Sequence, residues 1–77
     1  MAELDALPAL PVGRYRHFKG GLYEVTGVAR CSETLTAMVV YRALYGEGGL
    51  WVRPLAMFVE EVEAEGRRRP RFEFIGT

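Results

Sequence analysis

The sequence has almost none of the residues that small proteins use for cross-links or metal sites: its 77 residues include one cysteine and one histidine. One cysteine cannot form a disulfide within the chain, and a structural zinc site needs four ligands. Net charge is also missing, because ten Lys and Arg residues balance ten Asp and Glu residues. A neutral chain creates no overall field that attracts nucleic acid or an anionic membrane. We therefore expect a fold that needs no metal, cofactor or disulfide.

Long apolar runs are absent too. No stretch approaches the ~20 apolar residues of a membrane-spanning helix, and no basic segment precedes an apolar one at the N-terminus, as it would in a secretory signal. Apolar residues make up 49% and charged residues 26% of the chain, a balance typical of globular proteins. These features predict a soluble, cytoplasmic domain that does not enter a membrane.

Aromatic residues are what the chain has in quantity, with one Trp, four Tyr and four Phe. Ordering about 65 residues costs roughly 100 kcal/mol, so a domain this small must pack every large side chain closely. A small β-barrel would bury such side chains well, and so would a homodimer. The composition leaves both states, monomer and homodimer, open.

Glycine and proline divide the chain. Residues 1–12 contain Pro8 and Pro11, which prevent a continuous helix, and we expect them to form a flexible or loosely docked arm. Residues 13–77 are expected to form a single small β-barrel domain. Its first predicted strands are 13–18, 22–30, 35–45 and 50–53, separated by turns that contain Gly20-Gly21 and Gly46-Glu47-Gly48-Gly49.

Alternation within these strands predicts which side chains share a face. In the third strand, Val39 and Tyr41 lie on one side, and Val40 and Arg42 lie on the other. Gly27, inside the second strand, is typical of a bulge or a bend. Neither side of the third strand is cleanly polar, which indicates that the strand is central or that its outer face is covered.

The segment between Pro54 and Gly66 allows two interpretations. Its apolar residues recur at helical spacing, which fits a helix of about twelve residues. Against that helix, the residues after Gly66 alternate like a strand, and the glycine itself suits a turn. We favour one helical turn at 54–57, followed by a hairpin that pairs residues 58–64 with 70–75.

Several motifs, in their order and spacing, resemble a known family. They are Gly13-Arg14-Tyr15-Arg16-His17-Phe18-Lys19-Gly20, Leu22-Tyr23-Glu24-Val25, Val39-Val40-Tyr41-Arg42-Ala43-Leu44-Tyr45-Gly46, Leu50-Trp51-Val52-Arg53-Pro54-Leu55, Met57-Phe58 and Pro70-Arg71-Phe72-Glu73-Phe74-Ile75. Together they resemble the DUF1653 family, small bacterial domains with no established function. The resemblance implies no activity, and it favours the hairpin over the long helix because related turns join two strands. The arm before Gly13 and the basic turn after Glu65 depart from the family's pattern.

Short strands with a helical turn before the later ones are typical of an SH3-like barrel. The expected fold is therefore mostly β: a small SH3-like barrel of about five strands, with a short helical turn near residues 54–57.

Two groups of residues are weak candidates for a site. His17, Cys31 and Glu33 are the residue types of a nucleophilic site, but their spacing gives no reason for them to meet, and a metal would need further ligands. The basic run Arg67-Arg68-Arg69-Pro70-Arg71 has the charge to touch phosphates. Ion pairs across the hairpin are the simpler interpretation of this run, with Glu60, Glu61, Glu63 and Glu65 as partners.

An aromatic and cationic surface is the strongest candidate. If Leu50 and Val52 face the core, alternation turns Trp51 and Arg53 outwards. Trp, Tyr and Arg provide the rigid contact area and the forked donors that binding surfaces use. The predicted binding residues are Trp51, Arg53, Arg42, Tyr45 and Tyr23, with His17 and Lys19 at the rim. The structural alternative is that Trp51 caps the barrel and Arg53 pairs with an acid such as Glu24 or Glu33.

These residues predict a non-enzymatic binding module for a peptide or protein partner, with single-stranded nucleic acid as a further ligand class. One alternative is a small enzyme or ligand-binding protein whose site lies in a homodimer cleft and uses His17 and Glu33. Another is a structural role, in which an exposed sheet edge completes a larger assembly. No residue is predicted to be catalytic.

Overall fold

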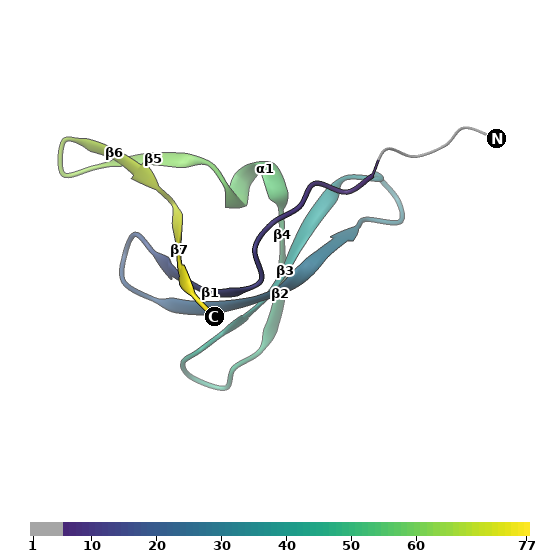
Figure 1. Ribbon diagram of the computed structural model, residues 1–77, viewed down its shortest axis with the longest axis horizontal. Coiled ribbons are helices and arrows are strands. Elements are labelled where there is room, and N and C mark those ends of the chain that lie inside the picture. The colour runs from purple at the N-terminus through teal and green to yellow at the C-terminus, as the bar shows by residue number, and fades with distance from the viewer. Residues whose placement is uncertain (1–5) are drawn as a thin grey trace.

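A five-stranded antiparallel sheet forms the body of the structure, a computed structural model that describes residues 6–77 (Figure 1). Its strands are β1 (Gly13–His17), β2 (Leu22–Arg30), β3 (Ala37–Ala43), β4 (Leu50–Pro54) and β7 (Phe72–Gly76). They lie in the order β4-β3-β2-β1-β7. Between β4 and β7 the chain forms the helix α1 (Leu55–Phe58) and a separate hairpin of β5 (Glu61–Ala64) and β6 (Arg67–Pro70).

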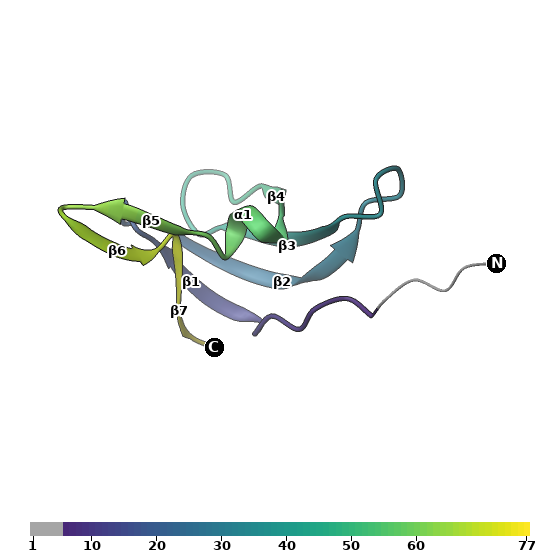
Figure 2. The same ribbon diagram turned by 90° about the horizontal axis from the view of Figure 1, so that it is seen from above.

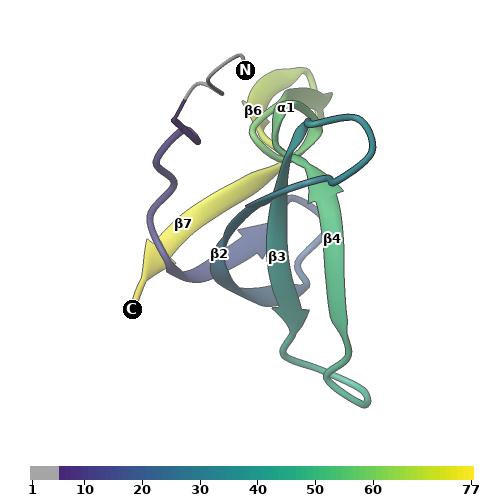
Figure 3. The ribbon, with the colours of Figure 1, turned by 90° about the vertical axis from the view of Figure 1, so that its right-hand side faces the viewer.

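The sheet is bent and open. Figure 2 shows α1 and the hairpin on one side of it, and Figure 3 shows the strands curving around that side. β4 and β7 are its two edges, and the described strands include no pairing between them that would close a barrel. The mostly-β fold and the short helical turn near residues 54–57 are confirmed. Because the described strands do not close into a barrel, the SH3-like barrel stays a prediction.

The predicted pairing of residues 58–64 with 70–75 is wrong. Glu65-Gly66 forms a tight turn with φ angles of 55° and 77°, so β5 pairs directly with β6. β7 then leaves the hairpin and pairs with β1. Burial explains the division, because β6 is exposed along its whole length whereas Phe72 of β7 is buried in the core. The long helix is not formed either, since α1 has four residues.

The alternation predicted for β3 is confirmed, with Val39 and Tyr41 buried and Arg42 exposed. The bulge expected at Gly27 is present too, because the β2–β3 register shifts between Val25 and Gly27. We call the side of the sheet that carries Val39 and Tyr41 the core face, and the opposite side the outer face.

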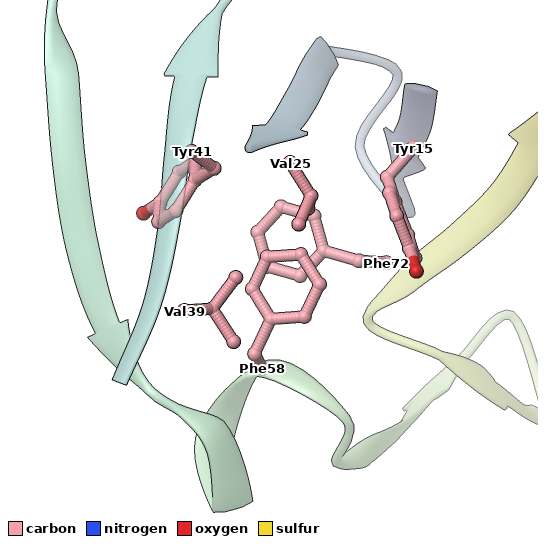
Figure 4. Packing of buried hydrophobic residues seen from close by; sticks show 6 residues of the cluster. All are labelled: Tyr15, Val25, Val39, Tyr41, Phe58 and Phe72. Carbon is pink, nitrogen blue, oxygen red and sulfur yellow. The ribbon is translucent and has the colours of Figure 1, made fainter. Parts of the chain in front are cut away.

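Six side chains form the core, and most of them are aromatic: Tyr15, Val25, Val39, Tyr41, Phe58 and Phe72 (Figure 4). Phe58 comes from α1 and lies flat on Phe72, with ring centroids 4.1 Å apart and planes inclined by 3°. Tyr15 meets Phe58 edge-on at 5.4 Å. One turn of helix therefore seals the core face by means of a single aromatic ring.

The described part of the arm is docked on the sheet. Leu10 packs against the core, and the Tyr15 hydroxyl donates a hydrogen bond of 2.7 Å to the Pro11 carbonyl. The flexibility expected for residues 1–5 lies outside the described residues. Within residues 6–77, no helix has the length and apolar character needed to cross a membrane.

Candidate functional site

Trp51 and Arg53 lie on the core face of β4. Trp51 stands opposite Tyr41, and Arg53 stands opposite Val39. Residues directly opposite one another in an antiparallel pair point to the same side of the sheet. The indole is still 61% exposed, because β4 is an edge strand. The sequence correctly predicted an exposed Trp51 but placed it on the wrong face.

The predicted faces of β4 are reversed throughout. Leu50 and Val52 stand opposite Arg42 and Val40 on the outer face, and each is 59% exposed. A one-residue shift in alternation moves every side chain of a strand to the other face. Leu50, Trp51 and Val52 are all apolar, so the sequence contains no polar residue there that would show which side of β4 faces the core. Arg42 consequently does not belong to the surface that Trp51 forms.

A groove of about 390 Å³ opens beside Trp51. Its walls include Tyr23, Tyr41 and Tyr45 and the glycine-rich loop at residues 46–49, and we call it the aromatic groove. Gly46 and Gly48 of that loop have φ angles of 61° and 66°, a backbone conformation that favours glycine. The loop turns tightly enough to bring Tyr45, itself 57% exposed, to the side of the groove.

A bonded pair of tyrosines forms one wall of the groove. The hydroxyl groups of Tyr23 and Tyr45 lie 2.6 Å apart and share a hydrogen bond. Burial, followed by this bond, raises the pKa of Tyr23 to about 12. The Tyr23 ring also contacts Tyr41 and Phe72 edge-on, at 5.6 Å and 5.4 Å. The wall is therefore continuous with the core and has little freedom to move.

Arg53 lies over an aromatic ring and keeps its donors free. Its Cζ atom is 5.5 Å from the centroid of Phe72. Within the described chain it forms no salt bridge, so the pairing with Glu24 or Glu33 that the structural alternative required does not occur. A guanidinium has five N–H donors in a fork that fits a carboxylate or a phosphate.

His17 and Lys19 lie near Arg53. The His17 ring contacts Phe72 at 4.9 Å, and its Nδ1 accepts a hydrogen bond of 3.1 Å from the backbone N–H of Lys19. Burial, followed by the positive charges of Arg53, Arg71 and Lys19, lowers the pKa of His17. The lowered pKa favours the neutral ring, and because Nδ1 accepts the Lys19 N–H, the proton of that ring is on Nε2, where it can act as a donor.

The structure thus brings together all of the predicted binding residues except Arg42. Sequence analysis missed Phe72, the ring that Arg53 and His17 share. It was assigned to the wrong strand pair, and nothing local to it indicates that it reaches β1, far away in the sequence.

The two residues of the enzymatic alternative, His17 and Glu33, lie far apart within one chain. His17 precedes β2 and Glu33 follows it, and a strand of nine residues spans roughly 30 Å. A hydrogen bond from the Thr34 side chain lowers the pKa of the Cys31 thiol, which has no histidine beside it in this loop. Among residues 6–77, no three His, Cys, Asp or Glu side chains are placed to hold a metal ion.

Comparisons with known proteins agree on one family. The model of the family described as "Protein of unknown function (DUF1653)" matches residues 13–74. A crystal structure of a DUF1653 protein from Bordetella bronchiseptica is similar, with 37% identity and a TM-score of 0.83 over 92% of this chain and 94% of that one. No curated protein matches the chain.

Proposed function

The chain belongs to the DUF1653 family, whose function is unknown, and on the geometry of its core face we propose that it is a non-enzymatic binding module. Its ligand is an extended segment of a partner protein. The segment places an apolar or aromatic side chain in the aromatic groove and a carboxylate on Arg53.

The exposed indole supports this proposal most strongly. Burying a large aromatic side chain contributes about 1.5–3 kcal/mol, and a small domain needs such contributions. Trp51 is nevertheless 61% exposed, beside a groove walled by three further rings. Tryptophan, tyrosine and arginine are the residues that contribute most to binding at protein interfaces.

The spacing of Trp51 and Arg53 suits an extended ligand. The two residues are separated by one position on an edge strand and point to the same face, so they lie about 7 Å apart. Side chains two residues apart in an extended peptide have the same separation. We expect an acidic residue, or a C-terminal carboxylate, two positions from the apolar anchor.

An SH3-like architecture is part of the proposal. The bent sheet supports it, because the core and the aromatic groove lie on the same inner face, as they would in a partly open barrel. We also propose a cytoplasmic location, which the single cysteine supports.

Peptide display tests this function. We expect selection of random peptides on the wild-type protein to enrich an apolar residue near an acid. Trp51→Ala should weaken the selected peptides about 30-fold or more, which is about 2 kcal/mol. Arg53→Gln should weaken them about tenfold, whereas the matched variant Arg42→Gln, on the outer face, should leave them unchanged.

Two outcomes would contradict the proposal. One is that wild-type protein enriches no peptide. The other is that Arg42→Gln weakens binding as much as Arg53→Gln does. A parallel titration with oligothymidylate separates the nucleic-acid class, which would bind through stacking on Trp51 with a steep dependence on salt.

A further inference from the structure

A second cavity, of about 290 Å³, is lined by residues of β1, β6 and β7. Arg16 and His17 of β1, residues 67–70 of β6 and Glu73 of β7 line it. We call it the basic pocket, because it contains four arginines and one glutamate. The whole chain has a net charge of +0, so positive charge is concentrated at this place.

The glutamates of the hairpin neutralise only part of this charge. Arg68 pairs with Glu61 at 3.3 Å, as the sequence predicted for the basic run. Glu60 pairs with Arg71, outside the pocket, at 3.2 Å. Of the arginines that line the pocket, Arg68 therefore forms the ion pair that was expected across the hairpin.

The other lining arginines keep their charge free for a ligand. Arg16, Arg67 and Arg69 form no salt bridge in the part of the chain that the structure describes. Glu73 stands opposite Arg16 in the β1–β7 pair, yet it is not within 4.0 Å of a guanidinium nitrogen there. Like charges held around one cavity repel each other, and a bound anion relieves that repulsion.

We propose that the basic pocket binds an anion of the phosphate class, either free or as the monoester of a small molecule. Guanidinium forks match the several acceptor oxygens of a phosphate group in charge and in geometry. His17 adds a neutral donor, because its Nδ1 accepts the Lys19 N–H and its proton is therefore on Nε2.

The pocket is suited to one phosphate group rather than to a nucleic-acid strand. A cavity of about 290 Å³ is at the lower end of small-molecule sites, which begin near 300 Å³. Glu63 and Glu65 on the same hairpin would repel the further phosphates of a polymer, and the neutral chain supplies no general attraction for one. This site does not depend on the aromatic groove, because the two cavities have no lining residue in common. His17 lines the basic pocket and lies at the rim of the predicted binding surface.

Titration followed by NMR tests the site, with inorganic phosphate and phenyl phosphate as probes at constant ionic strength. We expect saturable shifts of the backbone signals of residues 16–17 and 67–69. The double variant Arg67→Gln, Arg69→Gln should weaken binding at least tenfold. The matched variant Arg14→Gln, on the same strand as Arg16 but outside the pocket, should bind as the wild type does. Equal binding of the two probes indicates a free anion, and tighter binding of phenyl phosphate indicates an ester.

Three results would overturn the site. The first is an absence of saturable shifts with either probe. The second is an equal loss of binding in Arg14→Gln, which would indicate unspecific charge attraction. The third is tighter binding of oligothymidylate than of either probe, with loss in the double variant, which would assign the pocket to nucleic acid.

Discussion

Replacing Phe58 by alanine should remove a large part of the free energy of unfolding. Phe58 is the buried side chain of α1 and is 1% exposed. It stacks on Phe72 at 4.1 Å and also contacts Tyr15 and Tyr41 at 5.4 Å and 5.6 Å. Removing it therefore opens a cavity bounded by three other rings, in the centre of the core.

The expected loss is about 3–5 kcal/mol, the usual cost of truncating a buried phenylalanine. A chain of this length has a total stability of roughly 4–12 kcal/mol, so the variant keeps little of it. Each kcal/mol lowers the melting temperature of a small domain by about 4–8 °C, which predicts a decrease of at least about 12 °C.

Thermal and urea unfolding, followed by circular dichroism, measure this loss. Met57→Ala is the matched control, because Met57 belongs to the same helical turn and is 47% exposed; it should change stability by less than about 0.5 kcal/mol. Phe58→Leu should lose about 1–2 kcal/mol and so stay folded if the alanine variant does not. Equal, small losses for Phe58→Ala and Met57→Ala would refute the role assigned to α1.

Two further predictions concern a titration and a glycine. In an ultraviolet titration, one tyrosine should ionise near pH 12, and Tyr45→Phe should lower that pKa by removing the bond to Tyr23. The pKa of Tyr23 in the folded protein lies above the ordinary value of 10.0, so its contribution to stability is complete below pH 10 and is lost as the pH rises towards 12. A titration in which every tyrosine ionises near pH 10 would contradict this. Gly13→Ala should destabilise the fold by about 1–3 kcal/mol, because φ is 134° and the new Cβ would lie 2.8 Å from the Gly76 carbonyl oxygen. Gly27→Ala, with open space at its Cβ, should be tolerated in the same unfolding assay, and equal effects of the two would show that the close approach is absent.

The sequence predicted those elements whose pattern is local. β3 alternates between buried and exposed side chains, so Val39, Tyr41 and Arg42 could be assigned to their faces. The turn at Glu65-Gly66 was equally recognisable, because glycine supplies the positive φ that a tight turn requires.

The face of β4 could not be predicted, because its pattern is not local. Leu50, Trp51 and Val52 are all apolar and are exposed to almost the same extent, between 59% and 61%. Their orientation is set by the register against β3, which depends on the length of the 46–49 loop. For the same reason, Arg42 could not be separated from the site residues by sequence alone.

The partner of β7 is a second non-local feature. β7 pairs with β1, from the opposite end of the domain, and this contact brings Phe72 beneath Arg53 and beside His17. The basic pocket depends on the same pairing, since its lining residues Arg16 and Glu73 are directly opposite each other in the β1–β7 pair. Both proposed sites therefore follow from strand pairings between distant segments, which a pattern along the chain does not report.

The most direct measurement follows both faces of one strand while a ligand binds. The tightest peptide from the display selection is added to labelled protein, and NMR records the indole N–H of Trp51 and the methyl groups of Leu50 and Val52. If the groove on the core face is the recognition surface, the indole signal shifts with saturation and the methyl signals stay in place. Shifts of the methyl groups with an unchanged indole would place binding on the outer face and contradict the proposed function.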